Sequence, residues 1–120
     1  MTKILAVDDS ASMRQMVSFT LKTAGFDVAE ASDGVEALKV AKSGSFDVII
    51  SDVNMPNMDG LTLVKELRGL PDYKFTPILM LTTESSTDKK QAGRAAGATG
   101  WIVKPFNPDQ LLATVNKVVG

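Results

Sequence analysis

Short, continuous runs of apolar residues alternate along this chain with longer stretches in which apolar residues recur every three or four positions. Apolar runs bounded by polar residues are typical of strands buried on both faces of a parallel sheet, and helical spacing is typical of amphipathic helices. Apolar runs predict strands over residues 4–7, 47–51, 78–81 and 100–103, and a weak alternation of apolar and polar residues predicts a further strand over 27–31; a helix follows each strand. Strict alternation of this kind predicts an α/β fold, with helices on both faces of a doubly wound, five-stranded parallel sheet.

Residues that start and stop helices support these boundaries. Gly25 suits the end of the first helix, because glycine readily adopts the left-handed backbone that terminates many helices. Asp33, with Glu36 three residues later, predicts a capped start for the second helix. Asn107 and Gln110 predict the same for the last helix. The fourth helix, between residues 85 and 97, offers mainly alanine and glycine for burial, so we expect it to be the most mobile.

Four of the predicted strands run into residues that suit phosphate or metal chemistry. The first runs into Asp8 and Asp9, the third into Asp52, the fourth into Thr82 and the fifth into Lys104. Ligands of an open parallel sheet bind outside the carboxyl ends of its strands, so these side chains should converge on one edge. Alternation alone does not fix the strand order. Convergence of the three carboxylates favours the order 2-1-3-4-5, which places the first and third strands side by side.

Composition excludes several classes of site and partner. The chain has 120 residues, which predicts one domain over 1–120. It has no histidine and no cysteine, so imidazole bases, disulfides and thiolate metal sites are excluded, and any metal must be a hard cation such as Mg²⁺ or Ca²⁺. A net charge of −1 favours neither nucleic acid nor an anionic membrane as a partner. No apolar stretch could span a bilayer and no signal peptide is recognisable, so the cytoplasm is the expected compartment.

Phosphoryl transfer is the chemistry that this set of residues suits best. Three clustered carboxylates repel one another unless a divalent cation binds them, and Mg²⁺ leaves room for a phosphate oxygen. Lys104 adds a positive charge and Thr82 a hydroxyl donor, and positioning with charge stabilisation is most of what phosphoryl transfer requires. Asp52 is the single acid at its strand end, so it is the best candidate for the nucleophile. Asp8 and Asp9 are then candidate metal ligands.

Each of these residues also has an ordinary structural interpretation when it is taken alone. Asp8 and Asp9 could be a polar turn that caps the first helix, and Asp52 could be a turn residue. Lys104 could be a solvated charge, and Thr82 a strand residue with no further role. The functional interpretation depends on their occurring together, in this order along the chain.

Five motifs spread along the chain carry a resemblance to a known family: VDDS at 7–10, SMR at 12–14, SDVNMPNMDG at 51–60, the TT pair at 82–83 and GWIVKPF at 100–106. Together they make the chain similar to the receiver domains of two-component response regulators, most closely to the single-domain chemotaxis regulators of the CheY type. Each motif alone is weak, whereas the combination is specific. The resemblance implies a flavodoxin-like (βα)5 fold with the strand order 2-1-3-4-5.

The resemblance also implies roles for the residues at the strand ends. Asp52 is expected to be the phosphoacceptor. The ligands implied for Mg²⁺ are Asp8, Asp9, Asp52 and the backbone carbonyl of Asn54. Thr82 is expected to hydrogen-bond the phosphoryl group, and Lys104 to pair with it.

Further positions follow from the same resemblance. The Lys104–Pro105 peptide bond is expected to be cis. Asn54 and Glu84, two residues beyond the acceptor and the switch threonine, hold positions that tune the lifetime of the acyl phosphate. Trp101 holds the place of a switch aromatic that is usually Tyr or Phe. Its indole is larger and carries an N–H that needs a partner when buried.

A chain of this type is expected to accept a phosphoryl group from a histidine kinase of the chemotaxis type, in a Mg²⁺-dependent reaction. Phosphorylation would shift an existing equilibrium between inactive and active forms. With no output domain expected, the signal would pass by binding a partner, which for a chemotaxis regulator is the flagellar motor switch. We expect a monomer that catalyses its own phosphorylation and dephosphorylation, and that is not an enzyme acting on an external substrate.

Several alternatives stay open at this point. A receiver could instead serve as a phosphorelay intermediate or a phosphate sink, which the sequence does not separate from motor binding. An aspartyl phosphatase of the haloacid dehalogenase type would want a second Asp two residues after the nucleophile, where this chain has Asn54. A flavodoxin-like electron carrier would need a Ser/Thr/Gly-rich loop after the first strand, where this chain has DDSASMR.

Overall fold

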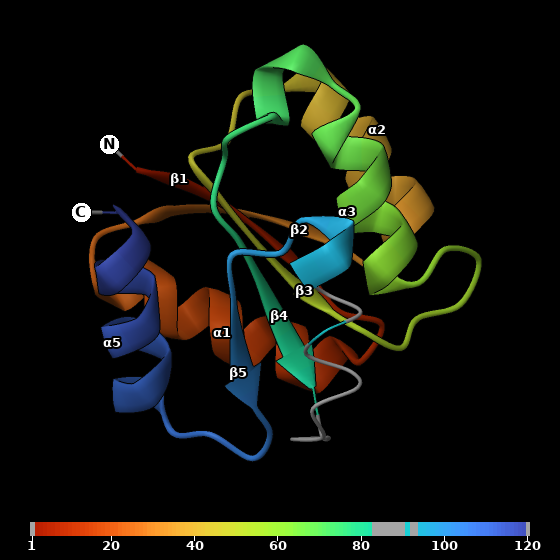
Figure 1. Ribbon diagram of the computed structural model, residues 1–120. Helices are drawn as coiled ribbons and strands as arrows, with labels where there is room; N and C mark the ends of the chain where they lie inside the picture. The colour runs from red at the N-terminus through yellow and green to blue at the C-terminus, as the bar shows by residue number, and fades with distance from the viewer. Residues whose placement is uncertain (1, 83–90, 92–93, 120) are drawn as a thin grey trace.

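The sheet has five parallel strands, as the sequence predicts. The computed structural model describes residues 2–82, 91 and 94–119. The strands are β1 (Lys3–Val7), β2 (Asp27–Ala31), β3 (Val48–Asp52), β4 (Ile78–Thr82) and β5 (Gly100–Val103). They are hydrogen-bonded in the order β2-β1-β3-β4-β5, which confirms the predicted order (Figure 1).

Helices cover both faces of the sheet. On one face lie α1 (Ala11–Thr23) and α5 (Pro108–Val119), and on the other lie α2 (Gly34–Ser43) and α3 (Gly60–Arg68) (Figure 1). A short 3-10 helix, η1 (Pro71–Tyr73), lies between α3 and β4. The predicted fourth helix falls mostly outside the described residues, among which 91 and 94–96 are helical.

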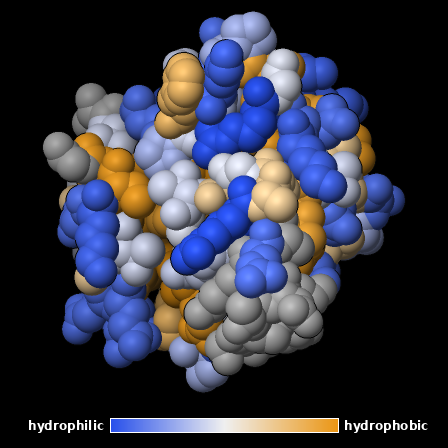
Figure 2. Space-filling view, in the orientation of Figure 1, coloured by the Kyte–Doolittle hydropathy of each residue, from blue (hydrophilic) through white to orange (hydrophobic). Residues whose placement is uncertain are grey.

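Two hydrophobic cores flank the sheet, because its central strands are buried on both faces. Alternate strand residues enter opposite cores: Leu5, Ile49 and Met80 enter the core under α2 and α3, and Ile4, Ile50 and Leu79 enter the core under α1 and α5. Figure 2 shows hydrophilic side chains over the outer sides of α5, at the lower left, and of α2 and α3, at the upper right. Within the described residues, no helix combines the length and the apolar character needed to cross a membrane.

The predicted helix caps are confirmed. The Asp33 carboxylate accepts from the backbone N–H of Glu36 at 2.8 Å. Asn107 and Gln110 cap the start of α5 reciprocally, since each side chain accepts from the other residue's backbone N–H, at 2.8 and 2.9 Å. After α1, Gly25 has φ +97°, in the left-handed region that favours glycine.

The third strand is shifted by one residue from its prediction. It was expected over 47–51 and covers Val48–Asp52. The pairing of β3 with β4 continues to its last residue, because Asp52 lies opposite Leu81. The predicted nucleophile is therefore the final residue of a strand, and the sheet holds its backbone.

Two side chains fix the segment between α3 and β4, and the sequence pattern did not reveal either contact. The Tyr73 hydroxyl is buried and donates to the Ala41 carbonyl at 2.6 Å, near the end of α2. Arg68 donates to the carbonyls of Thr76, at 2.6 Å, and Gly97, at 3.0 Å. Arg68 thus links the end of α3 to both segments that enter β4 and β5.

We expect Tyr73→Phe to lower the free energy of unfolding by about 1–2 kcal/mol at pH 7, because the buried Ala41 carbonyl loses its donor. Burial raises the pKa of the Tyr73 hydroxyl above its ordinary value of 10.0. The stability that the protonated hydroxyl contributes is therefore fully present below pH 10 and is lost as the pH rises through the raised pKa of the folded state. The variant should lose less stability than wild type between about pH 9 and pH 11 in urea unfolding. Parallel declines in both proteins would contradict this.

Candidate functional site

The three carboxylates meet at the carboxyl edge of the sheet, as predicted. One oxygen from each of Asp8, Asp9 and Asp52 lies within 4.8 Å of the other two. Asp8 follows β1 and Asp52 ends β3, and these strands are neighbours. Asp8 is 2% exposed and Asp52 9%, whereas Asp9 is exposed. The cluster is therefore buried at its base and reaches solvent at Asp9.

Lys104 brings a positive charge to the buried carboxylates. Its Nζ lies 3.2 Å from Asp52 Oδ1 and 3.5 Å from Asp8 Oδ2, and its side chain is 14% exposed. The Lys104 backbone N–H donates to the Thr82 carbonyl at 2.7 Å, which holds the end of β5 against β4. The Lys104–Pro105 peptide bond is cis, as expected. The alternative interpretation of Lys104 as a solvated surface charge is therefore wrong.

Asp52 does not find full compensation for its charge within the protein. Burial is the largest influence and raises its pKa above the ordinary value of 3.8. The positive charge of Lys104 lowers the pKa, and the carboxylate of Asp8 raises it again, so that the net direction is upward. The ammonium group of Lys104 thus does not offset the burial of the Asp52 carboxylate, and a further cation at this edge would favour ionised Asp52.

Asp8 is oriented by contacts with α1. Its Oδ1 accepts from the backbone N–H of Ser10 at 2.9 Å, and its carbonyl accepts from Arg14 Nη1 at 2.7 Å. Arg14 Nε also lies 3.2 Å from Glu30 Oε1 on β2. The cap of α1 is Ser10, whose hydroxyl accepts from the backbone N–H of Met13 at 3.3 Å. The alternative in which the two aspartates cap the first helix is therefore wrong. Arg14 belongs to the SMR motif, but nothing in the sequence indicates its contact with Asp8.

The β3–α3 loop covers residues 53–59, and its first residue holds Asp52 in place. The backbone N–H of Val53 donates to Asp52 Oδ1 at 2.9 Å and to the Leu81 carbonyl at 3.2 Å. At the far end of the loop, the Gly60 N–H donates to the Val53 carbonyl at 2.8 Å. A Cβ at Gly60 would lie 2.2 Å from the Asp52 carbonyl, so only glycine allows this close approach.

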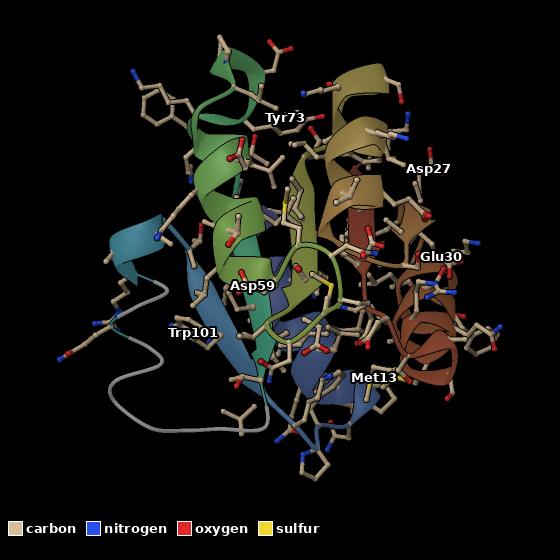
Figure 3. The ribbon with its side chains drawn as sticks, turned by 90° about the vertical axis from the view of Figure 1, so that its right-hand side faces the viewer. Met13, Asp27, Glu30, Asp59, Tyr73 and Trp101 are labelled. Carbon is tan, nitrogen blue, oxygen red and sulfur yellow. The ribbon has the colours of Figure 1, made fainter. Side chains whose placement is uncertain are left out.

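Thr82 and Trp101 lie on the same face of the sheet. Trp101 is paired with Met80, two residues before Thr82, and side chains two residues apart on a strand share a face. The Trp101 ring is partly buried against the core under α2 and α3 (Figure 3). Thr82 is buried at the end of β4, beside the strand that carries Asp52. Glu84 lies outside the described residues.

The donor set of this edge fits a hard divalent cation. Its three carboxylates supply oxygen ligands, and the chain has no histidine or cysteine that would favour a softer metal. Asp9 offers the most accessible carboxylate, so an ion could enter from solvent. Asn54 is exposed two residues beyond Asp52, and its role as a ligand through its carbonyl stays a prediction.

Known proteins resemble this chain over nearly its whole length. A family model, described as the response regulator receiver domain, matches residues 4–116. The chain is 40% identical over 117 residues to the chemotaxis protein CheY-3 of Vibrio cholerae serotype O1, which covers 97% of this chain and 90% of that protein. The structure of the chemotaxis response regulator CheY4 of Vibrio cholerae matches with a TM-score of 0.96 at 64% identity, over 98% of both chains.

A second solved structure is informative about the acidic edge. It is the receiver domain of a sensor histidine kinase from Pseudomonas aeruginosa, with a magnesium ion coordinated in the active-site cleft of that protein. It matches with a TM-score of 0.92 at 25% identity and covers 99% of this chain and 98% of that chain. A fold like that of the present chain therefore holds a divalent cation in at least one other protein.

We expect Mg²⁺ to raise the melting temperature, because an ion that binds the folded site and not the unfolded chain stabilises the folded state. At a metal concentration about 100-fold above the dissociation constant, the gain should be about 2.7 kcal/mol. Asp9→Asn should raise the stability of the metal-free protein, since it removes one repelling charge, and should reduce the response to Mg²⁺. Thermal melts at matched ionic strength test this, with Asp27→Asn, an exposed acid at the opposite end of the sheet, as the control. A wild-type response in Asp9→Asn would exclude Asp9 as a ligand.

Proposed function

Because this chain belongs to the receiver domains of response regulators, and to their CheY-like chemotaxis type, we propose that it is a phosphorylation-operated switch with Asp52 as the phosphoacceptor. The observation that supports this most directly is the geometry of Asp52. It is a buried carboxylate at the end of a central strand, 3.2 Å from Lys104 and within a cluster of three acids. A carboxylate needs no general base to act as a nucleophile, because it is already ionised near neutral pH.

In the proposed transfer, an Asp52 carboxylate oxygen attacks the phosphorus of a phosphohistidine on the kinase. The O–P bond forms as the P–N bond breaks, and the imidazole takes up a proton from solvent. Lys104 then turns from the Asp52 carboxylate to the phosphoryl oxygens, which lie within reach because the two side chains are in contact beforehand. The Thr82 hydroxyl donates to a phosphoryl oxygen from the end of the neighbouring strand.

We propose Mg²⁺ as the metal of this site. Its ligands would be Asp8, Asp9, Asp52 and the backbone carbonyl of Asn54. When bound, it would supply the positive charge that neutralises the transferring phosphoryl group. The support for a divalent ion is that the positive charge of Lys104, which also contacts Asp8, does not offset the burial of Asp52, so that the pKa of Asp52 stays raised.

The switch in this proposal runs through Thr82 and Trp101. Formation of the acyl phosphate draws the Thr82 hydroxyl toward the phosphoryl group, and the half-buried indole then takes a second packing position on the same face of the sheet. Two discrete positions are expected, because a densely packed interior does not deform continuously. Asn54 and Glu84 would tune the lifetime of the acyl phosphate from positions beside the site.

The input in this proposal is a histidine kinase of the chemotaxis type, and the output is binding to the flagellar motor switch. The chemotaxis proteins among the relatives support this direction. A phosphorelay intermediate or a phosphate sink is the alternative output for the same chemistry. In either case the chain would act in the cytoplasm as a monomer, with no turnover on an external substrate.

We expect acetyl phosphate with Mg²⁺ to add one phosphoryl group to the wild-type protein and none to Asp52→Asn. Intact-protein mass spectrometry measures this directly. Asp59→Asn is a matched control, because Asp59 caps α3 from the same loop and asparagine is an equally good cap. Equal labelling of wild type and Asp52→Asn would show that another residue is the acceptor.

Activation with beryllofluoride should strengthen binding to purified motor switch protein by about tenfold or more, a typical allosteric coupling. Thr82→Ala should keep phosphorylation at Asp52 but lose most of this gain, whereas the exposed Thr62→Ala should behave like wild type. Calorimetric titrations of the three proteins, with and without beryllofluoride, decide the outcome. If neither state of the wild type binds the motor protein, the phosphate-sink alternative is favoured instead.

A further inference from the structure

The β3–α3 loop is joined to the start of α2 by contacts that the phosphoryl-transfer chemistry does not itself require. Asn57 Nδ2 donates to Asp33 Oδ2 at 2.8 Å, and the backbone N–H of Gly34 donates to the Met58 carbonyl at 3.2 Å. A Cβ at Gly34 would lie 2.6 Å from the Met58 carbonyl, so the two backbones touch. Figure 3 shows the loop arching away from Asp59 toward this helix.

Asp33 uses its two carboxylate oxygens for two different elements. Its Oδ1 accepts from the Glu36 N–H at 2.8 Å and caps α2, while Oδ2 accepts from Asn57. Both hydrogen bonds lower the pKa of Asp33, that of Glu36 being the larger cause, as expected for an ionised acceptor. A helix cap needs only one oxygen, so the second contact is a separate feature of the structure.

Asn57 has a role in the backbone conformation of the loop and a second role through its side chain. Its φ is +66°, in the left-handed region, where asparagine and glycine are the favoured residues. Glycine would meet the backbone demand at no steric cost, but it would offer no amide to Asp33. The structure therefore allows the backbone role of this position and its side-chain contact to be separated by one substitution.

We propose that Asp33 and Asn57 form a clasp, the Asp33–Asn57 clasp, that positions the β3–α3 loop for metal binding at the acidic edge. Both are positioning residues in this proposal, which rests on the metal site of the proposed function. The loop is short, and the hydrogen bond from the Gly60 N–H to the Val53 carbonyl joins its two ends. A displacement at residue 57 is therefore carried over three residues to the carbonyl of Asn54, the proposed ligand. Mg²⁺ demands near-ideal octahedral geometry, so it is sensitive to such a displacement.

Three single variants and one double variant test the clasp. Asn57→Gly keeps the left-handed backbone and removes the amide. Asp33→Ser keeps a helix cap and removes the second oxygen. Asp33→Asn loses the same charge as Asp33→Ser, but its amide can donate to Asn57 once that side chain turns its oxygen inward. The double variant combines Asn57→Gly with Asp33→Ser.

The measurement is the dissociation constant for Mg²⁺, from calorimetry on metal-free protein, with melts in chelator to confirm that each variant is folded. Asn57→Gly and Asp33→Ser should each bind Mg²⁺ about tenfold more weakly. This is the low end of the loss of metal affinity expected when a residue that orients a metal ligand is removed. The double variant should be no worse than either single variant, because both remove one contact, and Asp33→Asn should stay close to wild type.

The possible results distinguish the clasp from the metal site on which it rests. Wild-type affinity in both Asn57→Gly and Asp33→Ser would overturn the clasp while leaving the metal site intact. Losses that add in the double variant would also overturn it, since the two side chains would then act independently. An equal loss of Mg²⁺ affinity in Asp33→Asn and Asp33→Ser would also overturn the clasp, because the charge of Asp33 and not its contact with Asn57 would then explain the loss. A wild-type protein that binds no Mg²⁺ would overturn the proposed metal site and the clasp together.

Discussion

Among the residues that the structure describes, two buried carboxylates share one ammonium group, and this sets the constraint on which the acidic edge depends. Asp8 and Asp52 are nearly inaccessible, and Lys104 contacts both at 3.2–3.5 Å. Charges removed from water must be paired, and a deficit of one positive charge raises the free energy of the ionised site. That deficit is also what makes the edge receptive to a divalent cation. The same electrostatic imbalance thus lowers the stability of the metal-free protein and supports its proposed chemistry.

Backbone contacts around these carboxylates fix their positions relative to one another. The N–H groups of Ser10 and Val53 hold one oxygen each of Asp8 and Asp52. The close approach of Gly60 to the Asp52 carbonyl brings the start of α3 directly behind the acceptor. These contacts are formed by the ends of regular elements rather than by long loops, which keeps the geometry stable against thermal motion. The clasp would extend the same principle to the outer side of the β3–α3 loop.

A switch needs an element that can occupy two positions, and the sheet supplies its framework. Thr82 and Trp101 occupy adjacent strands on one face, so a change at the first can reach the second without crossing the sheet. Trp101 is only partly buried, in contrast to Met80 beside it, which is fully buried. A side chain at the boundary of a core can change its packing at less energetic cost than one within it.

The amino-acid sequence by itself determined the features that depend on local chemistry or on strand direction. Apolar runs predicted four of the five strands, because a strand buried on both faces must be largely apolar. The remaining strand, β2, has the sequence DVAEA and was predicted from a weak alternation of apolar and polar residues. The helix caps at Asp33 and Asn107 could be predicted because the donor and the acceptor of each cap lie only three residues apart in the sequence. The meeting of Asp8, Asp9 and Asp52 followed from the rule that parallel strands end at one edge.

Only the tertiary structure decided which distant groups become partners. Tyr73 and Ala41 are separated by 32 positions, and Asn57 and Asp33 by 24. Arg14 was visible as part of a motif, but its bond to the Asp8 carbonyl depends on how α1 lies against the sheet. The final residue of β3 was also set by pairing with β4 rather than by its own polarity. A polar side chain in a sequence shows that it needs a hydrogen-bond partner, but folding alone brings a particular partner within 3 Å.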